Sequence, residues 1–294
     1  MKTFSLFFLL LLFCFEVFAH QGFGILVDES ENIFFTDISR QTIWKIDKNK
    51  NLIPLAKEFW SHQICFDKSQ NLYFTNEEVV KGKNGHSLWK LSKSGNLKQV
   101  IPPTSRDKFI SDIFLVSENE ELVLATNSKL FFAPNLENLE SLSILKEGFE
   151  SIRSIFNFGD KIYVVDGDKI KILSNEKVVT LAENLVEKDV SNISMNFIPN
   201  PKTINRLFGL AVDESENVFV AYFGNSQILK IDSKGEKSVF YQSKDSWSPV
   251  GIAISENGLV VKESKFVEKV GWLGPKIIKV SWDKKVEEIL KLKD

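Results

Sequence analysis

The chain repeats one four-part unit, and this repetition limits the folds open to it more than any other feature. The first unit reads Gly24–Asp28, Asn32–Asp37, Ile43–Asp47 and Asn51–Ala56. Each phrase is short, rich in β-branched and aromatic residues, and bounded by Asp, Asn, Ser, Gly or Lys, which is typical of strands joined by turns. The same order returns clearly in three later units and in degenerate form in two others between them.

One four-stranded sheet cannot bury both of its faces alone, so six such sheets are expected to stack around an axis. Residues 20–294 divide into six units of about 46 residues, which is the usual size of a propeller blade. We therefore predict an all-β, six-bladed β-propeller with four antiparallel strands in each blade. The expected blades are 20–58, 59–103, 104–146, 147–187, 205–244 and 245–294, with a long inter-blade loop at 188–204.

Residues 1–19 predict a cleavable signal peptide. Lys2 supplies the positive charge, residues 4–15 form an apolar run, and Ala19 places a small residue at the cleavage site. A lipoprotein anchored through Cys14 is the alternative, but the large residue before that cysteine disfavours it. Cleavage leaves Cys65 as the one cysteine, so we expect no internal disulfide in the mature chain. Cleavage also removes the apolar run, so we expect no transmembrane segment in the mature chain. We expect an exported protein of a bacterial periplasm, or a secreted or cell-surface protein.

The balance of charge argues against a nucleic acid as partner. The chain has 37 Lys and Arg against 39 Asp and Glu, a net charge of −2. This supplies no positive field for a polyphosphate. Glycine-rich phosphate loops and Gly-x-Ser-x-Gly elbows are missing from the sequence, and three histidines do not make a metal-ligand cluster.

Two of the clear units carry a family resemblance. Gly209–Asp213 followed by Val218–Ala221, and Gly251–Ser255 after Ser248–Val250, resemble NHL-type repeats. They also resemble the related gluconolactonase/regucalcin-like six-bladed propellers, over essentially the whole mature chain. The resemblance implies the same architecture, in a group that includes lactonases, esterases, synthases and binding modules.

The two ends of the expected ring differ in the length of their connections. Antiparallel order places the turns between strands one and two, and three and four, at one end, which we call the short-turn face. The other end, the long-loop face, carries the connections between strands two and three and the links between blades. The longest connections all lie there, at 76–87, 184–208 and 263–276. Variation confined to one end predicts that the long-loop face is the functional surface.

In the lactonase-like relatives, a divalent metal lies on the axis at this end. The resemblance places its ligands immediately before the glycine position of the inner strands, at Phe23, Phe208 and Val250. These apolar side chains offer no oxygen to a hard cation. We therefore predict no metal and no other cofactor, and expect a divalent metal such as calcium only if the protein is a hydrolase.

Polar and aromatic side chains are expected around the mouth of the channel on this face. His62 and Asp112 occupy equivalent positions in adjacent units and could meet, either for general-base catalysis or as a pair that closes the mouth. Arg153 and Arg206 could receive a carboxylate or phosphate, or could be structural. The other candidates for ligand contact are Tyr222, Asn225, Trp247, Glu263 and Trp272.

These features predict an exported, non-catalytic propeller that binds a protein, peptide or glycan on its long-loop face. A lactonase- or esterase-like hydrolase with a rearranged centre at His62 and Asp112 is the alternative. A scaffold for a larger envelope complex is a third hypothesis.

Overall fold

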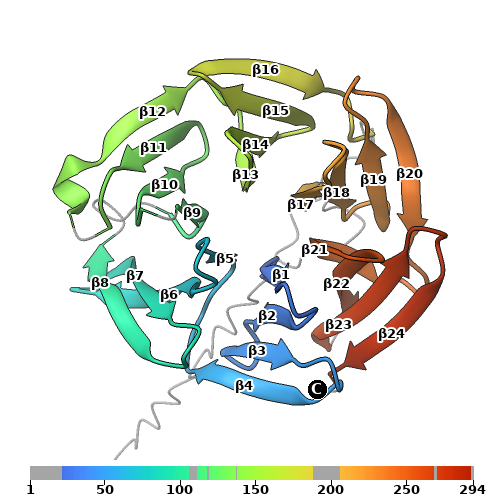
Figure 1. Ribbon diagram of the computed structural model, residues 1–294, viewed down its shortest axis with the longest axis horizontal. Coiled ribbons are helices and arrows are strands. Elements are labelled where there is room, and N and C mark those ends of the chain that lie inside the picture. The colour runs from blue at the N-terminus through green and yellow to red at the C-terminus, as the bar shows by residue number, and fades with distance from the viewer. Residues whose placement is uncertain are drawn as a thin grey trace, which may run out of the picture.

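The computed structural model describes residues 22–105, 111–117, 119–136, 138–187, 206–267 and 270–292. Within these residues, six four-stranded sheets are arranged in a ring (Figure 1). The strands of each sheet are consecutive along the chain and antiparallel to their neighbours. The predicted all-β, six-bladed propeller is therefore confirmed. The expected signal peptide and the whole of the expected 188–204 loop lie outside the described residues.

Each blade is named by its place along the chain. Blades 1 and 2 contain β1 (Ile25–Val27), β2 (Ile33–Asp37), β3 (Thr42–Ile46), β4 (Leu52–Lys57), β5 (Ile64–Phe66), β6 (Leu72–Val80), β7 (Lys83–Leu91) and β8 (Leu97–Ser105). Blades 3 and 4 contain β9 (Phe114–Val116), β10 (Leu122–Ala125), β11 (Lys129–Ala133), the short 3₁₀ helix η1 (Leu139–Ser141), β12 (Ser143–Glu147), β13 (Ile152–Phe158), β14 (Lys161–Asp166), β15 (Lys169–Ser174) and β16 (Lys177–Ala182). Blades 5 and 6 contain β17 (Leu207–Val212), β18 (Val218–Tyr222), β19 (Gln227–Ile231), β20 (Lys237–Gln242), β21 (Ser248–Ser255), β22 (Gly258–Val267), β23 (Gly271–Ser281) and β24 (Val286–Lys291).

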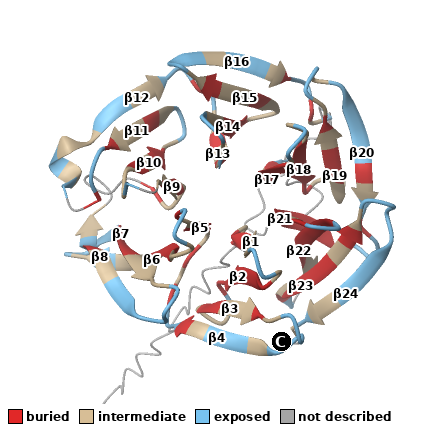
Figure 2. Cartoon of the chain, viewed as in Figure 1, coloured by how far each residue is buried: buried red, intermediate tan, exposed pale blue. Residues whose placement is uncertain are grey.

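The hydrophobic core is divided among the contacts between neighbouring blades. Six apolar clusters of the described residues each join one blade to the next around the ring. Burial is therefore heaviest in the inner and middle strands, while the outermost strands expose much of their surface (Figure 2). All five residues of β2 are buried, because both faces of that strand are covered by neighbouring blades.

The ring closes between blade 6 and blade 1 through side chains. In the described part of the chain, these two blades form separate sheets, so neither lends a strand to the other. Ile25 and Phe35 of blade 1 share an apolar cluster with Val260 of blade 6. Gly251 lets the inner strands approach closely, because a Cβ there would lie 2.1 Å from the carbonyl oxygen of Phe23.

Two connections expected as long loops are instead extended hairpins. Pairing of β6 with β7 continues to Val80 and Lys83, and pairing of β22 with β23 continues to Val267 and Gly271. The strands lengthen because the residues beyond the blade still pair across each hairpin. Two strands also run just beyond the expected blade limits of 103 and 146, since β8 ends at Ser105 and β12 at Glu147. No helix in the described ranges has the length and apolar character needed to span a membrane.

Candidate functional site

His62 and Asp112 meet on the long-loop face, where the first strands of blades 2 and 3 begin. His62 Nδ1 lies 2.7 Å from Asp112 Oδ2, and the two side chains are 12% and 26% exposed. The predicted meeting of these side chains is confirmed. Because each residue comes two positions before its inner strand, the pair also joins two neighbouring blades.

The electrostatics of this pair favour a charged carboxylate. Burial raises the pKa of Asp112, but the hydrogen bond with His62 and the charges of His62 and His86 outweigh it and lower the pKa below its usual range. His86 lies in β7 and is itself buried. A carboxylate held at Nδ1 orients an imidazole, which is the arrangement that general-base catalysis requires.

Arg153 and Arg206 lie on the adjacent blades 4 and 5. Arg153 is in β13 and half-buried, and Arg206 directly precedes β17 and is exposed. Burial and the positive charge of Arg206 both lower the pKa of Arg153. Among the described residues, neither guanidinium forms an ion pair with a carboxylate. Two neighbouring guanidinium groups without an acidic partner are suited to bind a carboxylate or a phosphate.

An aromatic cluster lies next to the backbone of Arg206. Trp272, on the β22–β23 hairpin, has its ring centroid 5.8 Å from that of Phe223 and 5.4 Å from that of Phe266. Phe223 is in turn 5.5 Å from Phe208, and its backbone N–H donates to the carbonyl oxygen of Arg206 over 3.0 Å. The hairpin thus brings the half-buried Trp272 against blade 5, close to the backbone of Arg206.

Two candidates on blade 5 have internal partners. Tyr222, the last residue of β18, is buried, and its hydroxyl accepts a hydrogen bond from the backbone of Glu187 over 3.0 Å. Asn225 is half-buried, and its backbone carbonyl oxygen accepts from Gln242 Nε2 over 3.0 Å. The structure therefore places Tyr222 in a contact that fixes the link after blade 4, where the sequence predicted a ligand contact.

Two further candidates are buried within the top of blade 6. Lys276 Nζ lies 4.7 Å from the ring centroid of Trp247 and 2.5 Å from Glu263 Oε2. Glu263 also accepts a hydrogen bond from Ser243 Oγ over 2.5 Å. Trp247 and Glu263 thus lie inside the blade instead of on the mouth, because the paired hairpin strands cover them.

The positions that correspond to the metal ligands of lactonase-like propellers do not fit a divalent cation. Phe208 contributes to the aromatic cluster, Val250 is buried, and Phe23 is half-buried with its carbonyl oxygen against Gly251. The described residues also contain no group of three or more His, Cys, Asp or Glu side chains placed to hold a metal ion. The absence of a cofactor stays a prediction.

Sequence reasoning missed Lys262, which is fully buried in β22. Its Nζ donates to the carbonyl oxygen of Thr36 and, over 3.0 Å, to Thr36 Oγ1 in blade 1. Burial lowers the pKa of Lys262 to about 7, although the charge of Asp37 raises it. Its burial could have been predicted from its place in the repeat, because the equivalent residues of blades 1 and 5, Thr36 and Ala221, are also buried.

No protein-family model matches the chain, and no curated protein matches its sequence. Solved structures do match. A protein of unknown function from Bacteroides thetaiotaomicron superposes with a TM-score of 0.63 at 13% identity, over 90% of this chain and 68% of that one. The calcium-binding protein regucalcin from Agrobacterium tumefaciens gives 0.58 at 13%, over 85% and 83%. A gluconolactonase from Xanthomonas campestris gives 0.56 at 9%, over 84% and 85%.

These comparisons define the class of protein. The chain is a six-bladed β-propeller. Its structural neighbours are propellers of the gluconolactonase and regucalcin kind, and at these identities the likeness concerns the fold.

Proposed function

We propose that the protein is a non-catalytic binding module that holds a peptide, protein or glycan on its long-loop face through a carboxylate of the ligand. The observation that carries this proposal is the proximity of Arg153 and Arg206, two positive groups that have no acidic partner among the described residues. Repulsion between two guanidinium groups, one of them half-buried, is relieved when an anion binds between them.

The aromatic cluster supports the same proposal. Trp272 presents a large and rigid apolar surface near Arg206, and such surfaces stack on sugar rings or pack against peptide side chains. A ligand with both an apolar part and a carboxylate matches this combination. The buried candidates Tyr222, Trp247 and Glu263 then act by fixing the blades that carry the site.

The test compares ligands that differ in charge alone. Oligogalacturonate should bind and its methyl ester should not, and poly-glutamate should bind where poly-glutamine does not. Arg153→Gln and Arg206→Gln should each weaken binding of the acidic ligands about tenfold. Arg40→Gln is the matched control, because Arg40 is already paired with Asp37 at 3.0 Å. Equal binding of charged and uncharged ligands, or binding unchanged in both variants, contradicts the proposal.

A hydrolase is the second candidate, and the contact between His62 Nδ1 and Asp112 Oδ2 favours it. Under this hypothesis, His62 removes a proton from water while Asp112 holds the ring and stabilises its positive charge. A panel of lactones and esters measures this directly. Turnover that disappears in both His62→Ala and Asp112→Asn replaces the binding proposal with a catalytic one.

Export to the periplasm or cell surface is also part of the proposal. It rests on residues 1–19 of the sequence, which lie outside the described ranges. N-terminal sequencing of the protein from a periplasmic or surface fraction should give His20 as the first residue. An intact Met1 in that fraction, or a purely cytoplasmic protein, contradicts export by cleavage.

A further inference from the structure

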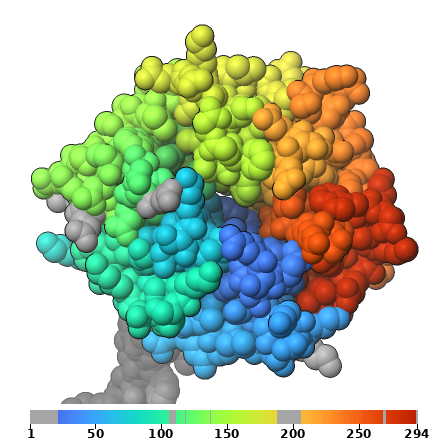
Figure 3. Space-filling view, viewed as in Figure 1, coloured from blue at the N-terminus to red at the C-terminus, as the bar shows by residue number. Residues whose placement is uncertain are grey.

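The short-turn face holds a cavity that the proposed function does not use. Its volume is about 550 Å³, and residues of β5, β9 and β13 form its walls, so it lies between blades 2, 3 and 4. The rim consists of the turns that follow these strands, at Lys68, Ser117 and Gly159. Figure 3 shows that the ring is hollow at its centre. A cavity of this size falls within the range of small-molecule sites.

The walls are built from one repeated position of the inner strand. The strand registers align this position around the ring, and in four successive blades its residue lines the cavity: Leu26, Cys65, Leu115 and Phe156. In blades 5 and 6 the same position is Ala211 and Ala253, both of which are buried in contacts between blades. The larger residues thus give the cavity an apolar wall on one side of the ring only.

Gln63 occupies the space between the inner strands of blades 2 and 3. At the equivalent inner-strand position, Gly24, Gly209 and Gly251 let adjacent inner strands touch. Gln63 instead places a side chain between blades 2 and 3, where its Nε2 donates to the carbonyl oxygen of Phe114 over 2.9 Å. Gln63 therefore bridges the two inner strands with a side chain, where glycine at the equivalent position would allow direct backbone contact.

The amide of Gln63 is only half satisfied. Gln63 is 6% exposed and lines the cavity, and its Oε1 has no hydrogen-bond partner among the described residues. A buried carbonyl group without a donor costs free energy that a hydroxyl or an amide N–H can recover. The charged residues of the cavity, Lys68 and Glu121, lie in turns at the rim and have opposite signs, so the interior favours an uncharged molecule.

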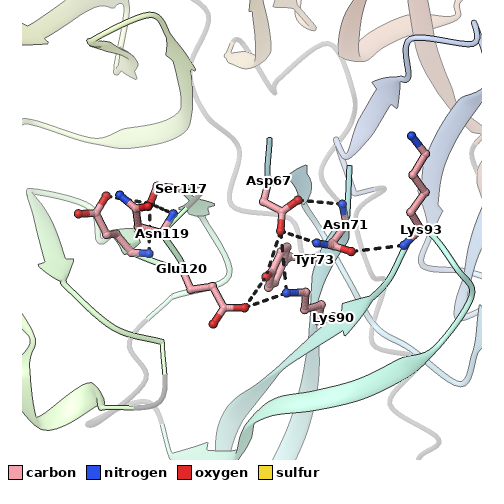
Figure 4. Close-up of polar contacts among 9 residues, drawn as sticks. Asp67, Asn71, Tyr73, Lys90, Lys93, Ser117, Asn119 and Glu120 are labelled. Atoms are coloured by element: carbon pink, nitrogen blue, oxygen red, sulfur yellow. Dashed lines mark hydrogen bonds and ion pairs between the residues drawn. The ribbon is translucent and has the colours of Figure 1, made fainter. Parts of the chain in front are cut away.

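The rim between blades 2 and 3 is fixed by a polar network (Figure 4). Lys90 Nζ lies 2.8 Å from Glu120 Oε1, and the Tyr73 hydroxyl lies 3.4 Å from Asp67 Oδ2 and 3.5 Å from Glu120 Oε1. Burial raises the pKa of Tyr73 to about 12, so this hydroxyl stays neutral and can donate at physiological pH. The network joins the two turns beside the cavity, which makes the opening a pre-formed feature.

We propose that this cavity binds a small uncharged molecule with an apolar body and one hydroxyl or amide donor, which bonds Gln63 Oε1. The molecule enters from the short-turn face, at the opposite end of the inner strands from the proposed long-loop site, and reaches inward to Gln63, which directly follows His62 in the chain. Leu115 and Phe156 contact its apolar body.

The first test uses 1-naphthol and naphthalene, which differ by one hydroxyl group. Titration of the purified protein, followed by ligand fluorescence, should show one saturable site and tighter binding of 1-naphthol by about tenfold, the value of one net hydrogen bond. Gln63→Leu keeps the approximate volume and removes the acceptor, so the preference should disappear. Equal affinities in the native protein, or a preference that survives Gln63→Leu, overturn the proposed recognition.

The second test fills the cavity. Leu115→Trp should abolish binding of 1-naphthol, whereas Ile144→Trp, an exposed apolar position of the same blade, should leave it unchanged. Circular dichroism checks that each variant folds. If Leu115→Trp does not fold, Leu115→Phe takes its place and should weaken binding of 1-naphthol. A cavity that holds only water shows no saturable binding in the native protein, and that result, or full binding by the filled variant, rejects the site.

Discussion

Lys262 in the last blade donates hydrogen bonds to both the carbonyl oxygen and the hydroxyl of Thr36 in the first blade. Burial lowers the pKa of Lys262 from 10.5 to about 7, against the opposing charge of Asp37, which is itself paired with Arg40. Between about pH 7 and 10 the unfolded chain therefore holds more protons than the folded protein. The free energy of unfolding should rise with pH over this range, by up to about 1.4 kcal/mol per pH unit.

Urea unfolding measured at several pH values from 6 to 9 tests this prediction. Lys262→Met keeps the length of the side chain and should remove the rise, because the variant has no proton to lose at this site. Below pH 7 the native protein carries the full cost of a buried charge. Parallel pH profiles for the native protein and the variant would show that Lys262 titrates normally.

Gly251→Ala should destabilise the ring strongly. A Cβ at this position would lie 2.1 Å from the backbone oxygen of Phe23, and backbone cannot move aside as a side chain can. We expect a loss of about 3 kcal/mol or more in the free energy of unfolding. Gly95→Ala is the control, since its Cβ meets open space and only its positive φ of 90° is unfavourable, at about 1 kcal/mol. Similar losses for both variants would argue against close contact at the closure.

Asp112→Asn should destabilise the protein by about 2 kcal/mol at neutral pH, because the carboxylate bonded to His62 is lost. The folded protein lowers the pKa of Asp112, so its contribution is complete above the ordinary pKa near 4 and falls as the pH drops below it. The difference between native protein and variant should therefore shrink in acid. A difference independent of pH down to pH 3 would be inconsistent with this assignment.

Cys65 should be unreactive in the folded protein. It is 6% exposed, and burial raises the pKa of its thiol to about 12, so very little thiolate exists at pH 8. Iodoacetamide should alkylate it slowly in buffer and rapidly in urea, as mass spectrometry of the intact chain can show. Rapid labelling without denaturant would mean that the thiol is reactive.

The fold was predictable because the repeat determines it. Phrases such as Asn32–Asp37 and Asn71–Asn76 have the length, residue types and turn borders of strands, and their recurrence indicates the number of blades. The extended hairpins were not predicted, because residues 76–87 and 263–276 are too polar to be distinguished from loops. Their pairing depends on contacts across the hairpin, which no local pattern in the sequence reveals.

The candidate site was predictable only in part. His62 and Asp112 could be brought together from equivalent places in adjacent repeats, since the ring makes those places neighbours. Trp247 and Glu263 were assigned to the mouth because the sequence places them near the long-loop end of blade 6. The sequence does not reveal that both side chains are buried. Lys262 resembles an ordinary surface lysine in sequence, and its partner lies 226 residues away.

Closure of the ring by side chains alone has a kinetic consequence. Blades 1 and 6 keep all their own backbone pairing when they separate, so the ring can open into an arc by losing contacts made through side chains. These include the apolar cluster of Ile25, Phe35 and Val260, the bonds of Lys262, and the ion pairs of Glu31 with Lys279 and of Lys50 with Glu287. The lifetime of the closed form is then limited by the contacts at this one seam. Substitutions at that seam will change the rate of opening more than the stability of any single blade.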